Sequence, residues 1–71
     1  MKNPERIKLF GSHLRRLREE RDLSQQNLAN IAGVAKITIQ RIENSKYSPT
    51  LDMLITLAEA LDITLKELVD F

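Results

Sequence analysis

The chain has 71 residues, of which 42% are hydrophobic and 30% are charged, and its formal net charge is +1. This length predicts a single domain over residues 1–71, large enough for the small core of an all-helical fold. With no cysteine and one histidine, the sequence excludes disulfides, thiolate metal sites and a multi-histidine zinc site, so we expect no metal and no cofactor. No apolar run approaches the roughly 20 residues that span a bilayer, and no signal peptide is evident, so we expect a cytoplasmic protein without a membrane partner.

The charge is unevenly distributed along the chain. Residues 1–47 hold ten Lys/Arg and five Asp/Glu, a net charge of +5, whereas residues 48–71 carry −4. A basic face toward nucleic acid and an acidic face away from it would steer docking. Ordinary surface charge on helices is the alternative that this distribution leaves open.

Helical periodicity predicts five helices and no sheet. The expected helices cover, in chain order, residues 4–21, 25–32, 36–44, 51–61 and 65–70. Asn3, Ser24 and Thr50 are expected N-caps, and Thr64 with Glu67 forms a capping box. No segment alternates apolar and polar residues for long, so the predicted fold class is all-α.

The apolar positions of these helices predict the core. The inward residues of the first and fourth helices are expected to be Ile7, Phe10, Leu14, Leu17, Leu51, Leu54, Leu57, Ala58 and Leu61. On the first helix, His13 and the arginines at positions 15, 16 and 21 are expected to be solvated, although one arginine could approach a DNA backbone at the flank.

The stretch QQNLANIAGVAKITIQR, residues 25–41, reads as two short helices joined by a turn. Ala29 is small enough for a close helix contact, and Gly33 can adopt the positive φ that the turn requires. Ile39 resumes the apolar face after the turn. This geometry leaves the second helix protruding, and a protruding helix fits the major groove of B-DNA, which is about 12 Å wide.

Five segments in this order and spacing, from about Phe10 to Leu68, resemble the Cro/CI-type (phage-repressor-like, XRE) helix-turn-helix family: FGSHLRRLREE, LSQQNLANIAGV, TIQRIEN, SPTLDMLITLAEAL and ITLKEL. The resemblance implies a compact five-helix, lambda-repressor-like bundle. It also implies a transcription regulator that binds double-stranded DNA with sequence specificity, as a homodimer on a palindromic operator. Restriction–modification controllers, small phage-type repressors and antitoxins are similar stand-alone proteins, so we expect no small-molecule effector domain.

Two other classes of function compete with this one. A helical protein-interaction module, such as an antitoxin or bridging factor with little DNA reading, is the alternative. An enzyme is disfavoured because the one histidine has no cysteine partner and the carboxylates are scattered along amphipathic helices.

The helix over residues 36–44 is expected to read the bases. Lys36, Ile37 and Gln40 share one exposed face, where lysine suits guanine, glutamine suits adenine and isoleucine suits a thymine methyl group. Arg41 and Ala35 complete the predicted base contacts, although Arg41 could instead hold a phosphate. Partial packing against a neighbouring loop is the alternative for Ile37.

The DNA backbone is expected to lie against two other segments. Ser24 and Gln25 stand at the start of a helix, where free amides and the helix dipole favour phosphate, and the resemblance implies a backbone clamp at Gln25. Asn44, Lys46 and Tyr47 follow the reading helix and suit phosphate contacts. The alternatives are a purely capping Ser24 and a solvated loop.

The resemblance also implies a structural ion pair between Arg18 and Glu43, which would brace the reading helix. Two positions depart from the family pattern. Ala35 stands where a serine or threonine usually caps the reading helix, a loss of about 1 kcal/mol. Ser45 stands where glycine usually ends that helix, so either Ser45 or Asn44 must take a positive φ.

An apolar C-terminal end suggests a self-association surface. Val69 and Phe71, with Met53 and Ile55, are the predicted dimer interface, and Leu9 could add to it. The alternative is that Phe71 folds back over the core.

Overall fold

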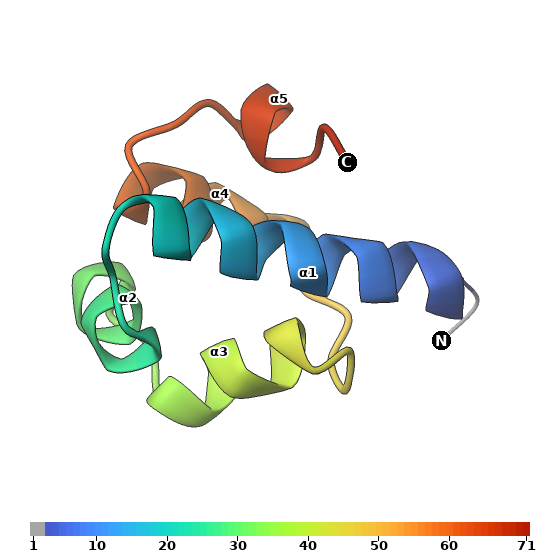
Figure 1. The fold of residues 1–71 in the computed structure, drawn as a ribbon, viewed down its shortest axis with the longest axis horizontal. Helices are drawn as coiled ribbons and strands as arrows, with labels where there is room; N and C mark the ends of the chain where they lie inside the picture. Colours follow the sequence, from blue (N-terminus) through green and yellow to red (C-terminus); the bar gives the residue numbers. More distant parts are fainter. Residues whose placement is uncertain (1–2) are drawn as a thin grey trace.

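The structure is a computed structural model that describes residues 3–71, and within them it contains five α helices and no strand (Figure 1). The helices are α1 (Pro4–Glu20), α2 (Gln25–Ala32), α3 (Lys36–Glu43), α4 (Leu51–Ala60) and α5 (Leu65–Leu68). The predicted all-α class is confirmed, and every helix starts at its predicted residue. Over residues 3–71, no helix has both the length and the apolar character that crossing a membrane would require.

The long helix α1 crosses the middle of the molecule, with α3 along one side of it and α5 on the other (Figure 1). The buried core takes residues from all five helices: Phe10, Leu14, Leu28, Ala29, Ile39, Ile42, Leu57, Ala58, Leu61 at the end of α4, and Leu68. Because α3 packs against both α1 and α2, its inner face is fixed while its outer face stays in solvent.

Local hydrogen bonds fix where three helices begin. The Ser24 hydroxyl accepts from the Asn27 amide at 2.9 Å, and Thr50 accepts from the amide of residue 53 at 3.2 Å. The predicted capping box of Thr64 and Glu67 is present, with both bonds at 3.0 Å. These three predictions are confirmed, and they explain why the helix starts were readable from local sequence.

The other two helices begin without a side-chain cap. The prediction for Asn3 is wrong, because its side chain makes no capping hydrogen bond. Pro4 instead suits the first position of α1, since it lacks the N–H that would be left unpaired there. Ala35 precedes α3 and offers no capping atom.

Four helices end on a residue with positive φ, and only one of these residues is glycine. At the end of α3 it is Ser45, with φ 63°, that adopts the left-handed conformation, while Asn44 does not. The Lys46 amide then donates to the Arg41 carbonyl at 2.7 Å, which closes the end of the helix. A serine in this conformation costs about 1 kcal/mol relative to an unstrained backbone.

Two predictions about burial are wrong. Leu51 is 63% exposed, because it lies in the first turn of α4, before that helix reaches the core. His13 is only 7% exposed, because α5 covers it. The His13 Nε2–H group donates to the Glu67 carbonyl at 3.2 Å, and Arg16 donates to Nδ1 at 3.2 Å.

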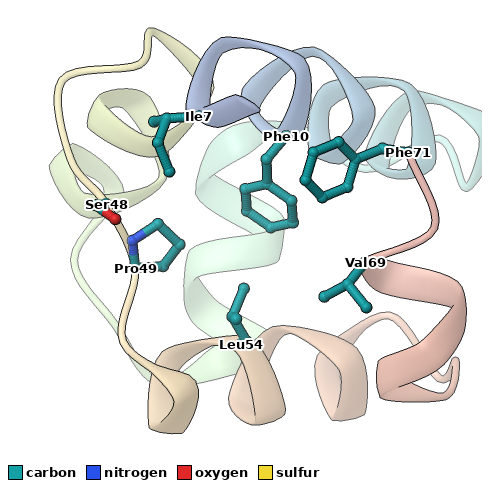
Figure 2. A pocket seen from close by; sticks show the side chains of 7 residues that line it. All are labelled: Ile7, Phe10, Ser48, Pro49, Leu54, Val69 and Phe71. Carbon is teal, nitrogen blue, oxygen red and sulfur yellow. The ribbon is translucent and has the colours of Figure 1, made fainter. Parts of the chain in front are cut away.

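The C-terminal segment folds back along α1, which was the alternative left open for Phe71. The Phe71 ring lies 5.6 Å from the ring of Phe10 and 5.9 Å from that of His13. Arg6 stacks over the Phe71 ring at 4.7 Å and donates to its carbonyl at 3.0 Å. Figure 2 shows this ring beside Phe10 at the rim of an apolar hollow.

Candidate nucleic-acid interface

The turn between α2 and α3 has the geometry that the sequence predicted. Gly33 adopts φ 73°, and the Val34 amide donates to the Ala29 carbonyl at 3.0 Å. A Cβ atom at residue 33 would meet nothing within 4 Å, so the glycine serves the backbone angle and not a tight contact. The turn thus sets α3 across the end of α2.

The outer face of α3 carries the predicted reading residues. Lys36 and Arg41 are exposed, Gln40 is half-buried, and Ile37 is 48% exposed. Ala35 is exposed at the start of the helix. The opposite face is anchored by two fully buried residues, Ile39 and Ile42. A helix fixed on one side and open on the other can enter a groove without rearranging.

The loop after α3 offers further polar groups near the same side. Asn44 and Lys46 are exposed, whereas Tyr47 is half-buried and packs against the core. Thr38, Arg41, Tyr47 and Met53 line one hollow. The structure therefore brings Tyr47 next to Arg41, and it places Met53 beside α3.

A buried ion pair ties α1 to the end of α3. Arg18 donates to Glu43 through Nε at 2.7 Å and through Nη2 at 3.0 Å, a bidentate pair. Arg18 is 8% exposed and Glu43 is 5% exposed. A third bond runs from Arg18 Nη1 to the Leu23 carbonyl at 2.8 Å. The pair thus fixes the C-terminal end of α3 on the scaffold.

The Glu43 carboxylate holds two further side chains that were not predicted to touch it. Gln25 Nε2 donates to Oε1 at 3.0 Å, and Arg15 Nε donates to the same oxygen at 3.3 Å. Burial raises the pKa of Glu43, but the hydrogen bonds from Arg18, Gln25 and Arg15 lower it more, so the net shift is downward. The hydrogen bond with Glu43 raises the pKa of Arg18.

We expect acid to weaken the fold through this carboxylate. Because the pKa of Glu43 is lower in the folded chain than its ordinary value of 4.5, its stabilising effect is full above that pH and is lost as pH falls through the folded pKa. The free energy of unfolding, measured by urea titration across pH 3–6, should fall less steeply in Glu43→Gln than in the parent. Equal pH dependence in the two proteins would contradict this role.

Arg15 and Arg21 are exposed, as predicted, but each makes a hydrogen bond that was not predicted. Arg15 is bonded to Glu43, and Arg21 Nε donates to the carbonyl of Leu61 at 3.0 Å.

The sequence analysis also missed the role of Gly11. A Cβ atom at Gly11 would lie 2.7 Å from the Ile42 carbonyl oxygen and 2.8 Å from that of Glu43. A glycine inside a helix, which costs about 1 kcal/mol relative to alanine, is the signal that could have revealed this contact.

Within the five-helix bundle, α2 and α3 are joined by a short turn, and the outer face of α3 is exposed to solvent. This arrangement is that of a helix-turn-helix protein. Residues 14–68 match the model of the helix-turn-helix family, and the chain belongs to this family. The predicted membership of the Cro/CI-type group is confirmed.

Three similar proteins illustrate the range of the family. The cryptic phage CTXphi transcriptional repressor RstR of Vibrio cholerae is 41% identical over 86% of this chain and 55% of its own length. The transcriptional repressor RghR of Bacillus subtilis is 49% identical over 76% of this chain and 41% of its own length. The chain therefore spans about half the length of these relatives. The crystal structure of the restriction–modification controller protein C.AhdI from Aeromonas hydrophila superposes with a TM-score of 0.85 at 35% identity, over 87% of this chain and 94% of that one.

Proposed function

We propose that this protein is a transcription regulator that binds double-stranded DNA with sequence specificity through α3. The observation that carries the proposal is that α3 is anchored on one side only: Ile39, Ile42 and Glu43 fix its inner face, and Lys36 and Ile37 are exposed on its outer face. The repressor names of its relatives support the same function. The relatives reported above come from bacteria, whose DNA lies in the cytoplasm, and we therefore propose a cytoplasmic location.

The chemistry of the outer face suggests what each residue recognises. Gln40 can pair bidentately with adenine, Lys36 can donate to guanine, and Ile37 can pack on a thymine methyl group. Ala35 at the helix start offers only a methyl contact. Arg41 can reach a base or, from its place beside Tyr47, a phosphate.

We assign the backbone contacts to the two ends of the reading unit. Ser24 and Gln25 present the start of α2 to one phosphate, and Gln25 keeps a second amide hydrogen after bonding Glu43. Asn44, Lys46 and Tyr47 lie after the C-terminal end of α3 and suit a neighbouring phosphate.

Base readout and backbone binding predict different effects of two alanine variants. Gln40→Ala should relax the preference at one position of the site, by about 1–3 kcal/mol against the favoured base. Lys46→Ala should weaken all duplexes alike and lower the slope of log K against log salt by about one. Fluorescence anisotropy with matched and mismatched duplexes at several salt concentrations measures both effects.

Two results would contradict this assignment. A site preference that is unchanged in Gln40→Ala, Lys36→Ala and Ile37→Ala alike would place the readout on another element. Binding to proteins without any salt-sensitive binding to duplexes would favour the interaction-module alternative.

We further propose that two copies bind a palindromic site through the apolar hollow in Figure 2. Its lining residues come from α1, the loop after α3, α4 and the C-terminal segment: Ile7, Phe10, Ser48, Pro49, Leu54, Val69 and Phe71. The hollow includes the loop after α3 but no residue of α3 itself, so a contact there would leave the outer face of α3 open. Two copies joined in this way would have to present their α3 helices to half-sites about 34–36 Å apart.

The four residues that were predicted for this interface do not lie in one place in the structure. Val69, 42% exposed, and Phe71 share the hollow. Met53 lines the separate hollow next to Arg41. Ile55 is 42% exposed on α4 and is not among the residues that line the hollow.

We expect Val69→Asp to give a folded monomer with much weaker binding to the palindromic site. A carboxylate at this position would be desolvated in an isologous contact, whereas Phe71 is unsuitable for the test because it covers Phe10. Leu51→Asp is the matched control, since Leu51 is 63% exposed and does not line the hollow. Sedimentation velocity gives the mass and circular dichroism checks the fold. A dimeric Val69→Asp, or a parent protein that stays monomeric on DNA, would count against this interface.

A further inference from the structure

We propose that Arg15 is a positioning residue for DNA-backbone binding, which fixes the side-chain amide of Asn44 with its NH2 group toward the DNA. The inference rests on the proposed function. Arg15 reaches from α1 to the end of α3, where Nη2 donates to Asn44 Oδ1 at 3.2 Å. Its Nε atom donates to Glu43 Oε1 at 3.3 Å.

The bond from Arg15 selects one orientation of the Asn44 amide. Asn44 is the C-cap of α3 and is exposed, so packing alone does not fix its side chain. Because the Arg15 guanidinium occupies the amide oxygen, both donors of Nδ2 remain on the other side. A phosphate oxygen only accepts hydrogen bonds, so this orientation binds it and the flipped orientation would repel it.

Arg15 is itself held in place by the buried Glu43 carboxylate. Glu43 is buried and is held by two bonds from Arg18, so the carboxylate that orients Arg15 is fixed on the scaffold. The same Oε1 atom also accepts from Gln25. One carboxylate oxygen therefore organises side chains at both ends of the proposed backbone contact, the start of α2 and the loop after α3.

Direct phosphate binding by Arg15 is the alternative to this positioning role. Its side chain is 45% exposed, and the bonds to Glu43 and Asn44 use two of the five N–H donors of a guanidinium. A positioning role predicts that removing Arg15 matters only while Asn44 is present. A direct contact predicts a loss that is independent of Asn44.

A double-mutant cycle on a duplex selected from a random pool tests the proposal. Arg15→Gln should weaken binding by about 3–10-fold, because Asn44 stays in place but its amide loses its fixed orientation. The double variant Arg15→Gln with Asn44→Ala should bind no more weakly than Asn44→Ala alone. Arg16→Gln is the matched control, because it removes the same charge from the same helix and should show no coupling to Asn44.

Two further measurements separate positioning from other roles of Arg15. The salt slope tests for a direct phosphate contact, and the NMR signals of Asn44 test for the orientation of its amide. The salt slope of Arg15→Gln should equal that of Arg16→Gln, and Arg15→Gln alone should shift the side-chain amide signals of Asn44 in the free protein. Additive losses, with a slope about one unit lower than in the control, would make Arg15 a phosphate ligand and overturn the inference. Failure of the parent to bind any duplex would instead overturn the proposed function.

Discussion

Replacing Glu43 with alanine is expected to cost about 3–5 kcal/mol of the free energy of unfolding, because it leaves a buried guanidinium without its counter-charge. Arg18 is 8% exposed and donates two bonds to this carboxylate. A chain of this length has a total stability of about 4–11 kcal/mol, so the loss would remove from about a quarter of that stability to all of it. Urea unfolding followed by circular dichroism measures the change.

The control for this variant is Glu59→Ala, which removes the same charge from an exposed position of α4. Its effect should stay within about 0.5 kcal/mol. Replacing Arg18 and Glu43 together by Met and Leu should recover part of the stability, because no charge is then left buried alone. Similar small losses in Glu43→Ala and Glu59→Ala would show that the pair does not brace α3.

Gly11→Ala is expected to destabilise the chain by about 1–3 kcal/mol, despite the helix propensity of alanine. In an open helix the substitution would gain up to about 1 kcal/mol. Here the new Cβ atom would lie 2.7 Å and 2.8 Å from two backbone carbonyl oxygens of α3, at Ile42 and Glu43. Backbone atoms cannot rotate away as a flexible side chain could, so α3 must move off α1.

That movement should also weaken DNA binding, because α3 carries the proposed reading face. Ser12→Ala is the control, since residue 12 is exposed on the same helix and gains the same propensity without the clash. Thermal unfolding and anisotropy titration of both variants give the comparison. A Gly11→Ala protein as stable as Ser12→Ala would mean that the close approach of α1 and α3 is dispensable.

Helix starts could be predicted from the sequence because their causes are local. Ser24, Thr50 and Thr64 cap the helix that follows each of them, and the caps lie within three residues of the amides they bind. Gly33 likewise marks its turn by its own backbone angle. These signals need no knowledge of the tertiary fold.

The contacts that were missed depend on segments far apart in the sequence. His13 is buried because α5 and the Phe71 ring return to α1, and its partner Glu67 lies 54 residues later in the chain. The phosphate clamp that the resemblance implies at Gln25 stays a prediction, but the bond of Gln25 to Glu43 was missed because it requires the packing of α2 beside the end of α3. Helical periodicity identifies which face is apolar, and it contains no information about which polar side chains meet across helices.

Selection of bound duplexes from a random pool tests the central claim most directly. The parent protein is expected to enrich one palindromic sequence whose half-sites lie one helical turn apart. Gln40→Ala, selected in parallel, should lose the preference at one symmetric pair of positions and keep the rest of the site. A pool that stays random after repeated rounds, with no salt-sensitive binding to any duplex, would contradict the proposal that α3 reads DNA.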